Sequence, residues 1–250
     1  MASKKTIGKY EKDLQIVNSI LNGKSENDLS FSEAVQLLNV YSVAYHESGK
    51  IEDLFSCDSS AHGCDFCNKM RKAAESDPTI ICGYCYDWKQ EEYRTNVLNR
   101  HSLNLRIMKS VLFTVEQLAF LPCGMYNRIN SSGEIDNLTQ ARNMIRYAKA
   151  HPNSNVTMWS KNKPIVEEAF KLEGKPNNMK FGQSSIHIDK ADKASEYADF
   201  VFTVYSTLEK VEEALQNEAI RCNGIKCKDC MACYNGSMKN GQAVAELLRK

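Results

Sequence analysis

The apolar residues near the start of the chain recur at helical spacing. A first helix, ending before Gly23, is predicted by Ile7, Tyr10, Leu14, Val17 and Ile20. Ser30 and Glu33 form a capping box that opens a second helix. The apolar residues of this second helix are Leu37, Leu38 and Val43. We expect both helices to pack against a core formed by later residues.

From residue 89 onward the pattern alternates between helices and strands. A long helix comes first, with one apolar face formed by Tyr93, Val97, Leu98, His101, Leu105 and Met108. Strands are predicted at the start of GMYNRINSSGEI and at NVTMWSKN, NMKFGQSSI and DFVFTVYS, and helices at NLTQARNMIRYAKAHP, KPIVEEAFKL and TLEKVEEALQ. Strands that alternate with helices imply crossover connections and a parallel sheet. The sequence therefore predicts an α/β fold, as a partial (βα) barrel or an open parallel sheet.

The predicted elements divide the chain into four parts. Residues 1–56 form a helical segment, 57–88 a cysteine-rich metal-binding loop, 89–220 the α/β core, and 221–250 a second cysteine cluster with a helix. Residues 57–88 are turn-rich and poor in apolar periodicity, so we expect something other than hydrophobic burial to order them.

Composition narrows the role of the cysteines. The chain has 250 residues, a net charge of +1 and ten cysteines. The N-terminus has no apolar stretch typical of a signal peptide, and no window reaches the roughly 18 apolar residues of a membrane-spanning helix. We therefore expect a cytoplasmic protein without a membrane partner. In a reducing compartment, clustered cysteines indicate metal ligands rather than disulfides.

The later cysteine group has four members within twelve positions, Cys222, Cys227, Cys230 and Cys233. A [4Fe-4S] cluster suits this crowding because each of its irons can take one thiolate. A single zinc ion can also be held by four thiolates. The spacing predicts a metal site and leaves both metals open.

The earlier cysteine group has five members, Cys57, Cys64, Cys67, Cys82 and Cys85. The last four have nearly the spacing of a two-knuckle zinc site, in which Cys57 and His62 take no part. Alternatively Cys57, Cys64 and Cys67 bind an iron–sulfur cluster, with the other two cysteines completing or flanking it. A zinc site here would order the loop without chemistry of its own.

Polar residues follow the predicted strands, where parallel sheets bind their ligands. Glu134 can hold an amine, Lys161 can neutralise a carboxylate or phosphate, and His187 can move a proton near neutral pH. Ser132 and Ser185 are further candidates. Each residue also has a structural alternative, since Glu134 can cap the next helix and Lys161 can simply face water.

Three stretches together resemble a known family. CGYCYDWKQ with its long helix, RINSSGEIDN with VTMWSKN, and CNGIKCKDCMACY resemble the gene-product-88-like proteins of phages and bacterial genomes. The likeness covers about residues 57–234 and implies a phage or prophage origin.

A more distant resemblance is to the radical S-adenosylmethionine enzymes. In that class a cysteine loop holds a [4Fe-4S] cluster, and a Gly-Gly-Glu-like turn after the next strand binds the methionyl amine. Here Ser132, Gly133 and Glu134 stand at the end of the strand that follows the cysteine loop, although no C-x3-C-x2-C occurs. The resemblance implies that these three residues bind S-adenosylmethionine and that Cys222 to Cys233 form an auxiliary site.

Two functions from different classes follow. The first is an iron–sulfur enzyme, similar to the radical S-adenosylmethionine class, acting on a small-molecule or nucleotide substrate. The second is a zinc-stapled phage protein that binds nucleic acid or a host protein without catalysis. A basic helix face that would suit phosphates is formed by Arg94, Arg100, His101, Arg106 and Lys109.

Overall fold

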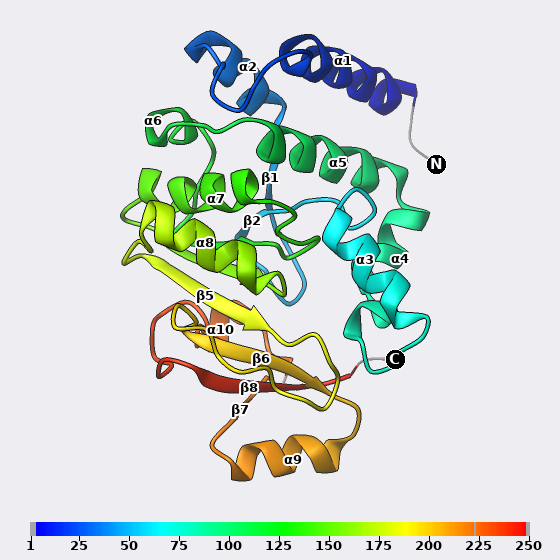
Figure 1. Ribbon diagram of the computed structural model, residues 1–250, viewed down its shortest axis with the longest axis vertical. Coiled ribbons are helices and arrows are strands. Elements are labelled where there is room, and N and C mark those ends of the chain that lie inside the picture. The colour runs from blue at the N-terminus through cyan, green and yellow to red at the C-terminus, as the bar shows by residue number, and fades with distance from the viewer. Residues whose placement is uncertain (1–3, 223, 249–250) are drawn as a thin grey trace.

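The computed structural model describes residues 4–222 and 224–248, and within this part eight strands form one sheet (Figure 1). Along the sheet the strands follow the order β1-β2-β3-β4-β5-β6-β8-β7. Their bounds are β1 Val43–Tyr45, β2 Phe55–Cys57, β3 Tyr126–Ile129, β4 Asn155–Ser160, β5 Met179–Ser184, β6 Phe200–Tyr205, β7 Ile220–Arg221 and β8 Gln242–Leu247.

The sheet is almost entirely parallel. Only β1 runs antiparallel to its neighbour β2, and every other neighbouring pair is parallel. Crossover helices separate β3 from β4 and β4 from β5. The predicted α/β class and parallel sheet are confirmed, and the sheet is open, with β1 and β7 at its edges.

Helices connect the strands and extend the fold beyond them. Their bounds are α1 Lys4–Leu21, α2 Phe31–Val40, α3 Asp65–Ala74, η1 Ile81–Tyr84, α4 Tyr86–Tyr93, α5 Thr95–Ser110, α6 Val115–Leu118, α7 Leu138–Ala150, α8 Lys163–Glu173, α9 Leu208–Gln216 and α10 Cys227–Cys230. No helix among these described residues has the length and apolar character needed to cross a membrane.

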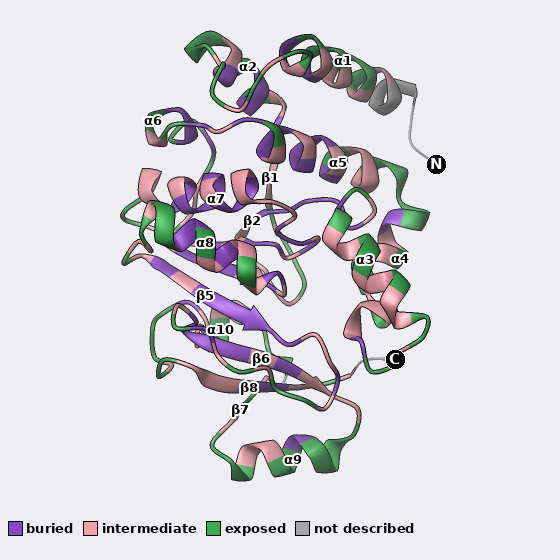
Figure 2. Ribbon diagram, viewed as in Figure 1, coloured by how far each residue is buried: buried purple, intermediate pink, exposed green. Residues whose placement is uncertain are grey.

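The hydrophobic core lies between the sheet and stacked layers of helices. Helices α7 and α8 lie nearest the sheet, α5 and α6 cover α7, and α1 and α2 form the outer layer (Figure 1). Ile145 of α7, Met158 of β4 and Phe181 of β5 are fully buried where these layers meet. The buried positions follow the inner faces of α7, β5 and β6 (Figure 2). This packing holds the carboxyl ends of β3 to β6 in fixed positions.

Two helix boundaries differ from the sequence prediction. Helix α2 keeps its predicted capping box but ends at Val40, and Val43 begins β1. The side chain of Asn104 holds the turn between them, because it hydrogen-bonds both the N–H and the carbonyl of Ser42 (2.8 Å each). The predicted long helix is two helices, and Tyr93, which closes α4, is 84% exposed rather than on an apolar face.

Residues 221–250, expected to hold a helix, contain the short helix α10 and the strand β8 within their described part. Strand β8 inserts between β6 and β7 and pairs with both in parallel. Cys222 follows β7 directly, and its N–H donates to the carbonyl of Ala245 in β8 (2.8 Å). The second cysteine group is therefore anchored to the sheet.

Candidate functional site

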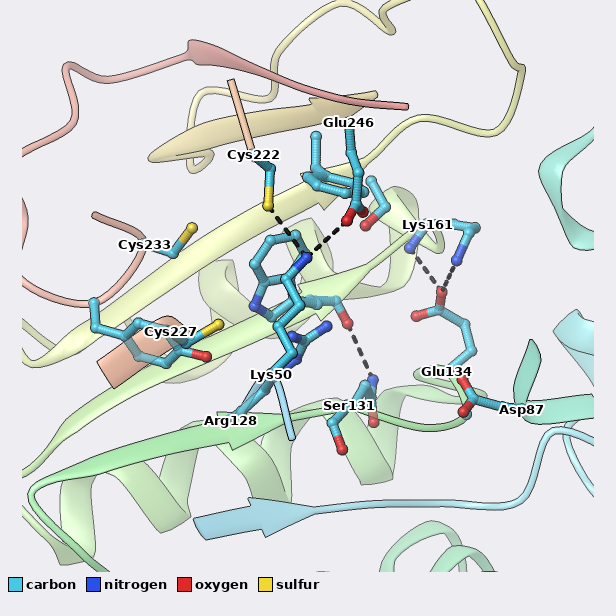
Figure 3. A pocket seen from close by; sticks show the side chains of 16 residues that line it. Lys50, Asp87, Arg128, Ser131, Glu134, Lys161, Cys222, Cys227, Cys233 and Glu246 are labelled. Atoms are coloured by element: carbon cyan, nitrogen blue, oxygen red, sulfur yellow. Dashed lines mark hydrogen bonds and ion pairs between the residues drawn. The ribbon is translucent and has the colours of Figure 1, made fainter. Parts of the chain in front are cut away.

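A cavity of about 210 Å³ lies at the carboxyl edge of the parallel strands (Figure 3). We call it the larger cavity. Ser131 after β3, Lys161 after β4, Ser184 in β5 and Glu246 in β8 line its wall. This is the edge at which parallel sheets bind their ligands, as the sequence led us to expect.

A second cavity, of about 50 Å³, adjoins the first. We call it the smaller cavity, and Cys67, Cys82 and Cys85 line it together with Arg71 and Trp88. The residues that line both cavities are Asp87, Gly133, Glu134 and Lys161. Helices α3 and α4 carry Arg71 and Trp88 of the smaller cavity. Figure 1 shows these two helices beside the end to which the arrows of β5 and β6 point. The two cavities therefore share one wall, and we call the pair the crevice.

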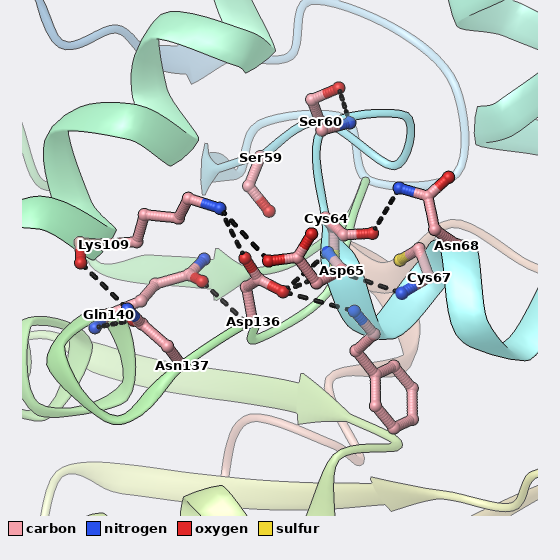
Figure 4. Close-up of polar contacts among 12 residues, drawn as sticks. Ser59, Ser60, Cys64, Asp65, Cys67, Asn68, Lys109, Asp136, Asn137 and Gln140 are labelled. Atoms are coloured by element: carbon pink, nitrogen blue, oxygen red, sulfur yellow. Dashed lines mark hydrogen bonds and ion pairs between the residues drawn. The ribbon is translucent and has the colours of Figure 1, made fainter.

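The first cysteines of this group, Cys64 and Cys67, lie at the start of α3, and of the two only Cys67 lines the smaller cavity. Cys64 is the N-cap, and its sulfur accepts the N–H of Cys67 (3.3 Å). The carboxylate of Asp136 accepts the N–H groups of Asp65 (2.7 Å) and Phe66 (3.2 Å), so it satisfies donors at the helix N-terminus (Figure 4). Lys109 holds that carboxylate from the other side (2.9 Å). The loop thus presents Cys67 to the smaller cavity in a fixed direction.

The other two cysteines of this group lie in the turn around η1. The guanidinium of Arg71 donates to the carbonyls of Cys82 (3.4 Å) and Gly83 (3.1 Å) and lies over the ring of Trp88 (5.1 Å). Burial raises the pKa of the Cys82 thiol, whereas the nearby Lys161 lowers it. Arg71 therefore ties the Cys82 turn to α3.

A buried carboxylate orders the segment that precedes Cys64. Glu91 is 1% exposed and accepts hydrogen bonds from the Ser60 hydroxyl (2.9 Å) and the backbone N–H groups of Ala61 (3.3 Å) and His62 (3.1 Å). The imidazole of His101 donates a further bond (3.0 Å). The cysteine-rich loop is thus ordered by polar contacts. This agrees with its lack of apolar periodicity in the sequence.

The second cysteine group lies across the larger cavity from Glu134 (Figure 3). Cys222, Cys227 and Cys233 line the cavity, whereas Cys230 is exposed. Lys50 donates to the sulfur of Cys222 (3.2 Å) and pairs with Glu246 (2.7 Å). Segments more than a hundred residues apart therefore bring thiols to opposite sides of one crevice.

The thiols are free to bind a metal, although their burial works against the thiolate form. All ten cysteines are free. Burial raises the pKa of Cys233 to about 12, and Arg128 opposes that rise. A thiol of this kind releases its proton when it binds a metal. Each group also has cations beside it, Arg71 and Lys161 for the first and Arg128 and Lys50 for the second, which offset thiolate charge.

The geometry does not by itself identify a metal. Over residues 4–222 and 224–248, no three His, Cys, Asp or Glu side chains are placed so that they could hold one metal ion. Four sulfur ligands that surround one zinc ion at 2.3 Å in a tetrahedron lie about 3.8 Å from each other. In a cubane cluster each thiolate binds a separate iron, so its sulfur ligands need not gather around a single point.

Glu134 and Lys161 lie together between the two cavities. Glu134 accepts the N–H groups of Ile135 (2.9 Å) and Lys161 (2.8 Å), and the Lys161 ammonium lies 3.9 Å from it. Gly133 has a φ of 81°, and a Cβ there would overlap the carbonyl oxygen of Ser59, so the turn requires glycine. Ser132 is buried, and its hydroxyl has no hydrogen-bond partner among the described residues.

Three other predicted residues lie away from both cavities. His187 hydrogen-bonds Thr79 (3.0 Å) on a half-exposed surface. The hydroxyl of Ser185 is held by Thr203 (2.8 Å) behind the strand ends. Cys57 is buried in the apolar core between the sheet and the helices. The structure thus brings Glu134 and Lys161 to the crevice but does not bring these three there.

Several residues that line the crevice were not predicted from the sequence. Asp87 faces both cavities, and burial raises its pKa to about 6. Lys50, Arg128 and Tyr234 line the larger cavity. Arg128 carried a usable signal, because a lone charge in the middle of a predicted buried strand needs a reason to be there.

The predicted basic helix face is divided in the structure. His101 is buried against Glu91, and Lys109 is paired with Asp136. Arg94 and Arg100 are exposed. The exposed positive charge of this helix is therefore smaller than the sequence suggested.

No family model, no curated protein and no solved structure matches the chain. The resemblances to gene-product-88-like proteins and to radical S-adenosylmethionine enzymes therefore stay predictions. Function has to be argued from the residues of the crevice themselves.

Proposed function

We propose that the chain is an iron–sulfur enzyme that acts on a small molecule bound in the crevice. One observation carries the proposal. Cys67, Cys82 and Cys85 line the smaller cavity, Cys222, Cys227 and Cys233 line the larger one, and the two cavities share a wall at the ligand-binding edge of a parallel sheet. Loops that were only stapled by a metal would not need to meet at such a cavity.

Each side of the crevice offers thiols that would hold a cluster. Cys67, Cys82 and Cys85, with Cys64 beside them, would hold a [4Fe-4S] cluster at the smaller cavity. Cys222, Cys227, Cys230 and Cys233 would hold an auxiliary one. A bound cluster would supply one-electron transfer next to the crevice. The neighbouring cations favour the negatively charged thiolates that such clusters need.

Glu134 is the residue that we assign to an ammonium group of the bound ligand, including that of S-adenosylmethionine. Each of its oxygens accepts one backbone N–H and has a further lone pair, and its side chain lines both cavities. Lys161 would lie against the opposite charge of the ligand or cluster. Gly133 lets the turn approach Ser59 closely, which fixes the position of Glu134.

Metal analysis of anaerobically purified protein tests the proposal. We expect brown protein with broad absorbance near roughly 400 nm and with iron and acid-labile sulfide. Cys67→Ser and Cys227→Ser should each lose about half of the iron, because each removes a ligand from one group only. Cys123→Ser is the matched control and should keep its iron, since Cys123 lines neither cavity and its thiol contacts Ser154 (3.2 Å).

A colourless protein with about two zinc ions per chain would contradict the iron–sulfur assignment and favour a zinc-stapled binding protein. Unchanged iron in both cysteine variants would remove these thiols as ligands.

A further inference from the structure

The larger cavity contains hydrogen-bond donors that have no partner. Among the described residues, the Nε of Arg128, the indole N–H of Trp159 and the hydroxyl of Tyr234 are buried without a hydrogen bond. All three side chains line this one cavity, and Tyr234 is only 2% exposed. Buried polar groups are nearly always satisfied, so three unpaired groups around one space point to a missing acceptor.

Arg128 is the cation of the lining that makes no close ion pair with a described residue. Its guanidinium lies over the ring of Trp159 (4.6 Å) and makes no ion pair with the described residues. The two lysines of the cavity are both paired, Lys50 with Glu246 and Lys161 with Glu134. A buried guanidinium without a partner is costly, and a bound anion would remove that cost.

The charges of the residues that line the cavity bear on whether the bound anion carries one negative charge or two. Lys50, Arg128 and Lys161 are balanced by three carboxylates, those of Asp87, Glu134 and Glu246. These six charges sum to zero before any thiolate charge is counted, so a ligand with one negative charge meets less repulsion than a phosphate dianion. A guanidinium also matches the two oxygens of a carboxylate in plane.

We propose that the larger cavity binds a small carboxylate ligand, with Arg128 as its anchor and with Trp159 and Tyr234 donating to it. Trp159 packs edge-on against Phe202 (5.1 Å), which also lines the cavity, so an apolar part of the ligand can lie on this aromatic wall. The assignment holds whichever metal the thiols bind, because none of its donors is a thiol.

A matched pair of probes tests the charge requirement. Benzoate and benzamide have the same shape, and only benzoate carries the negative charge. Isothermal titration of the purified protein with its metal content intact should show millimolar or tighter binding of benzoate and at least tenfold weaker binding of benzamide. Phenylphosphonate, tested as a dianion at pH 8, should bind more weakly than benzoate. Equal binding of benzoate and benzamide, or tighter binding of phenylphosphonate, overturns the assignment.

Three variants test the residues. Arg128→Gln should weaken benzoate binding at least tenfold, whereas the exposed Arg94→Gln should change neither benzoate binding nor the metal content. Unchanged benzoate affinity in Arg128→Gln overturns the proposal. Tyr234→Phe removes only the hydroxyl and should weaken benzoate binding about threefold to tenfold with no effect on benzamide. Unchanged benzoate affinity in Tyr234→Phe also overturns the proposal, even if Arg128→Gln does not fold.

Discussion

Replacing Glu91 by glutamine should destabilise the whole protein. Glutamine keeps the shape of the side chain, but one acceptor oxygen becomes an NH2 group. Each oxygen of Glu91 accepts two bonds: one takes those of Ala61 and His101, and the other takes those of Ser60 and His62. Whichever oxygen is replaced, two buried donors lose their acceptor.

The size of the effect follows from these contacts. A hydrogen bond to a charged group contributes about 1.5–3 kcal/mol, and two are lost. We therefore expect the free energy of unfolding at pH 7 to fall by about 3–6 kcal/mol. Glu168→Gln is the control, because Glu168 is exposed on α8, and it should change stability by less than about 0.5 kcal/mol.

The pH dependence separates this explanation from a simple packing defect. Burial acts to raise the pKa of Glu91, but the hydrogen bonds from His101, His62 and Ser60 outweigh it and lower the pKa below its ordinary value. The stabilisation by its charge is therefore complete above the unfolded pKa of about 4.3 and is lost as the pH falls through the lower folded pKa. Urea unfolding from pH 7 to pH 3 should show the gap between parent and variant narrowing below about pH 4. A gap that stays constant, or a variant as stable as Glu168→Gln, would refute this reasoning.

Two further substitutions test the turn and the core. Gly133→Ala should lower the free energy of unfolding by about 2–4 kcal/mol, which is more than Gly174→Ala should. Both glycines have a positive φ, but only at Gly133 would an added Cβ clash with neighbouring atoms. Equal losses of the two variants in urea unfolding would show that the clash is relieved. Cys57→Ala should retain all the iron of the parent protein, because Cys57 lies in the apolar core. A loss of iron per folded chain would show that Cys57 is a ligand.

The central βα units were predictable because their signals are local. The helix over 138–150 and the strands on either side of it show their periodicity in a single window, and each became α7, β3 or β4. Strands β1, β2, β7 and β8 were not predicted. Apart from β8 they are only two or three residues long, and pairing with distant parts of the chain decides whether such segments form strands.

The residues of the site that could be predicted are likewise those with local signals in the sequence. Glu134 and Lys161 follow predictable strands, and the structure brings them to the crevice. Cys57 could not be placed without β2, because alternate residues of a strand face opposite sides and its side chain turns into the core. Tyr234 could not be assigned at all, since only the folded chain shows its hydroxyl buried without a partner.

The position of β8 also sets an order for biosynthesis. Cys222 is held by a strand that the ribosome makes some twenty residues later, since its N–H bonds Ala245. The thiols of residues 64–85, by contrast, rest on α3, α4, the turn after β3 and the segment 186–188, which bonds Thr79 and Ile81, and all of these are translated by about residue 188. During translation, metal loading can therefore begin at the first group while the second still lacks its anchor.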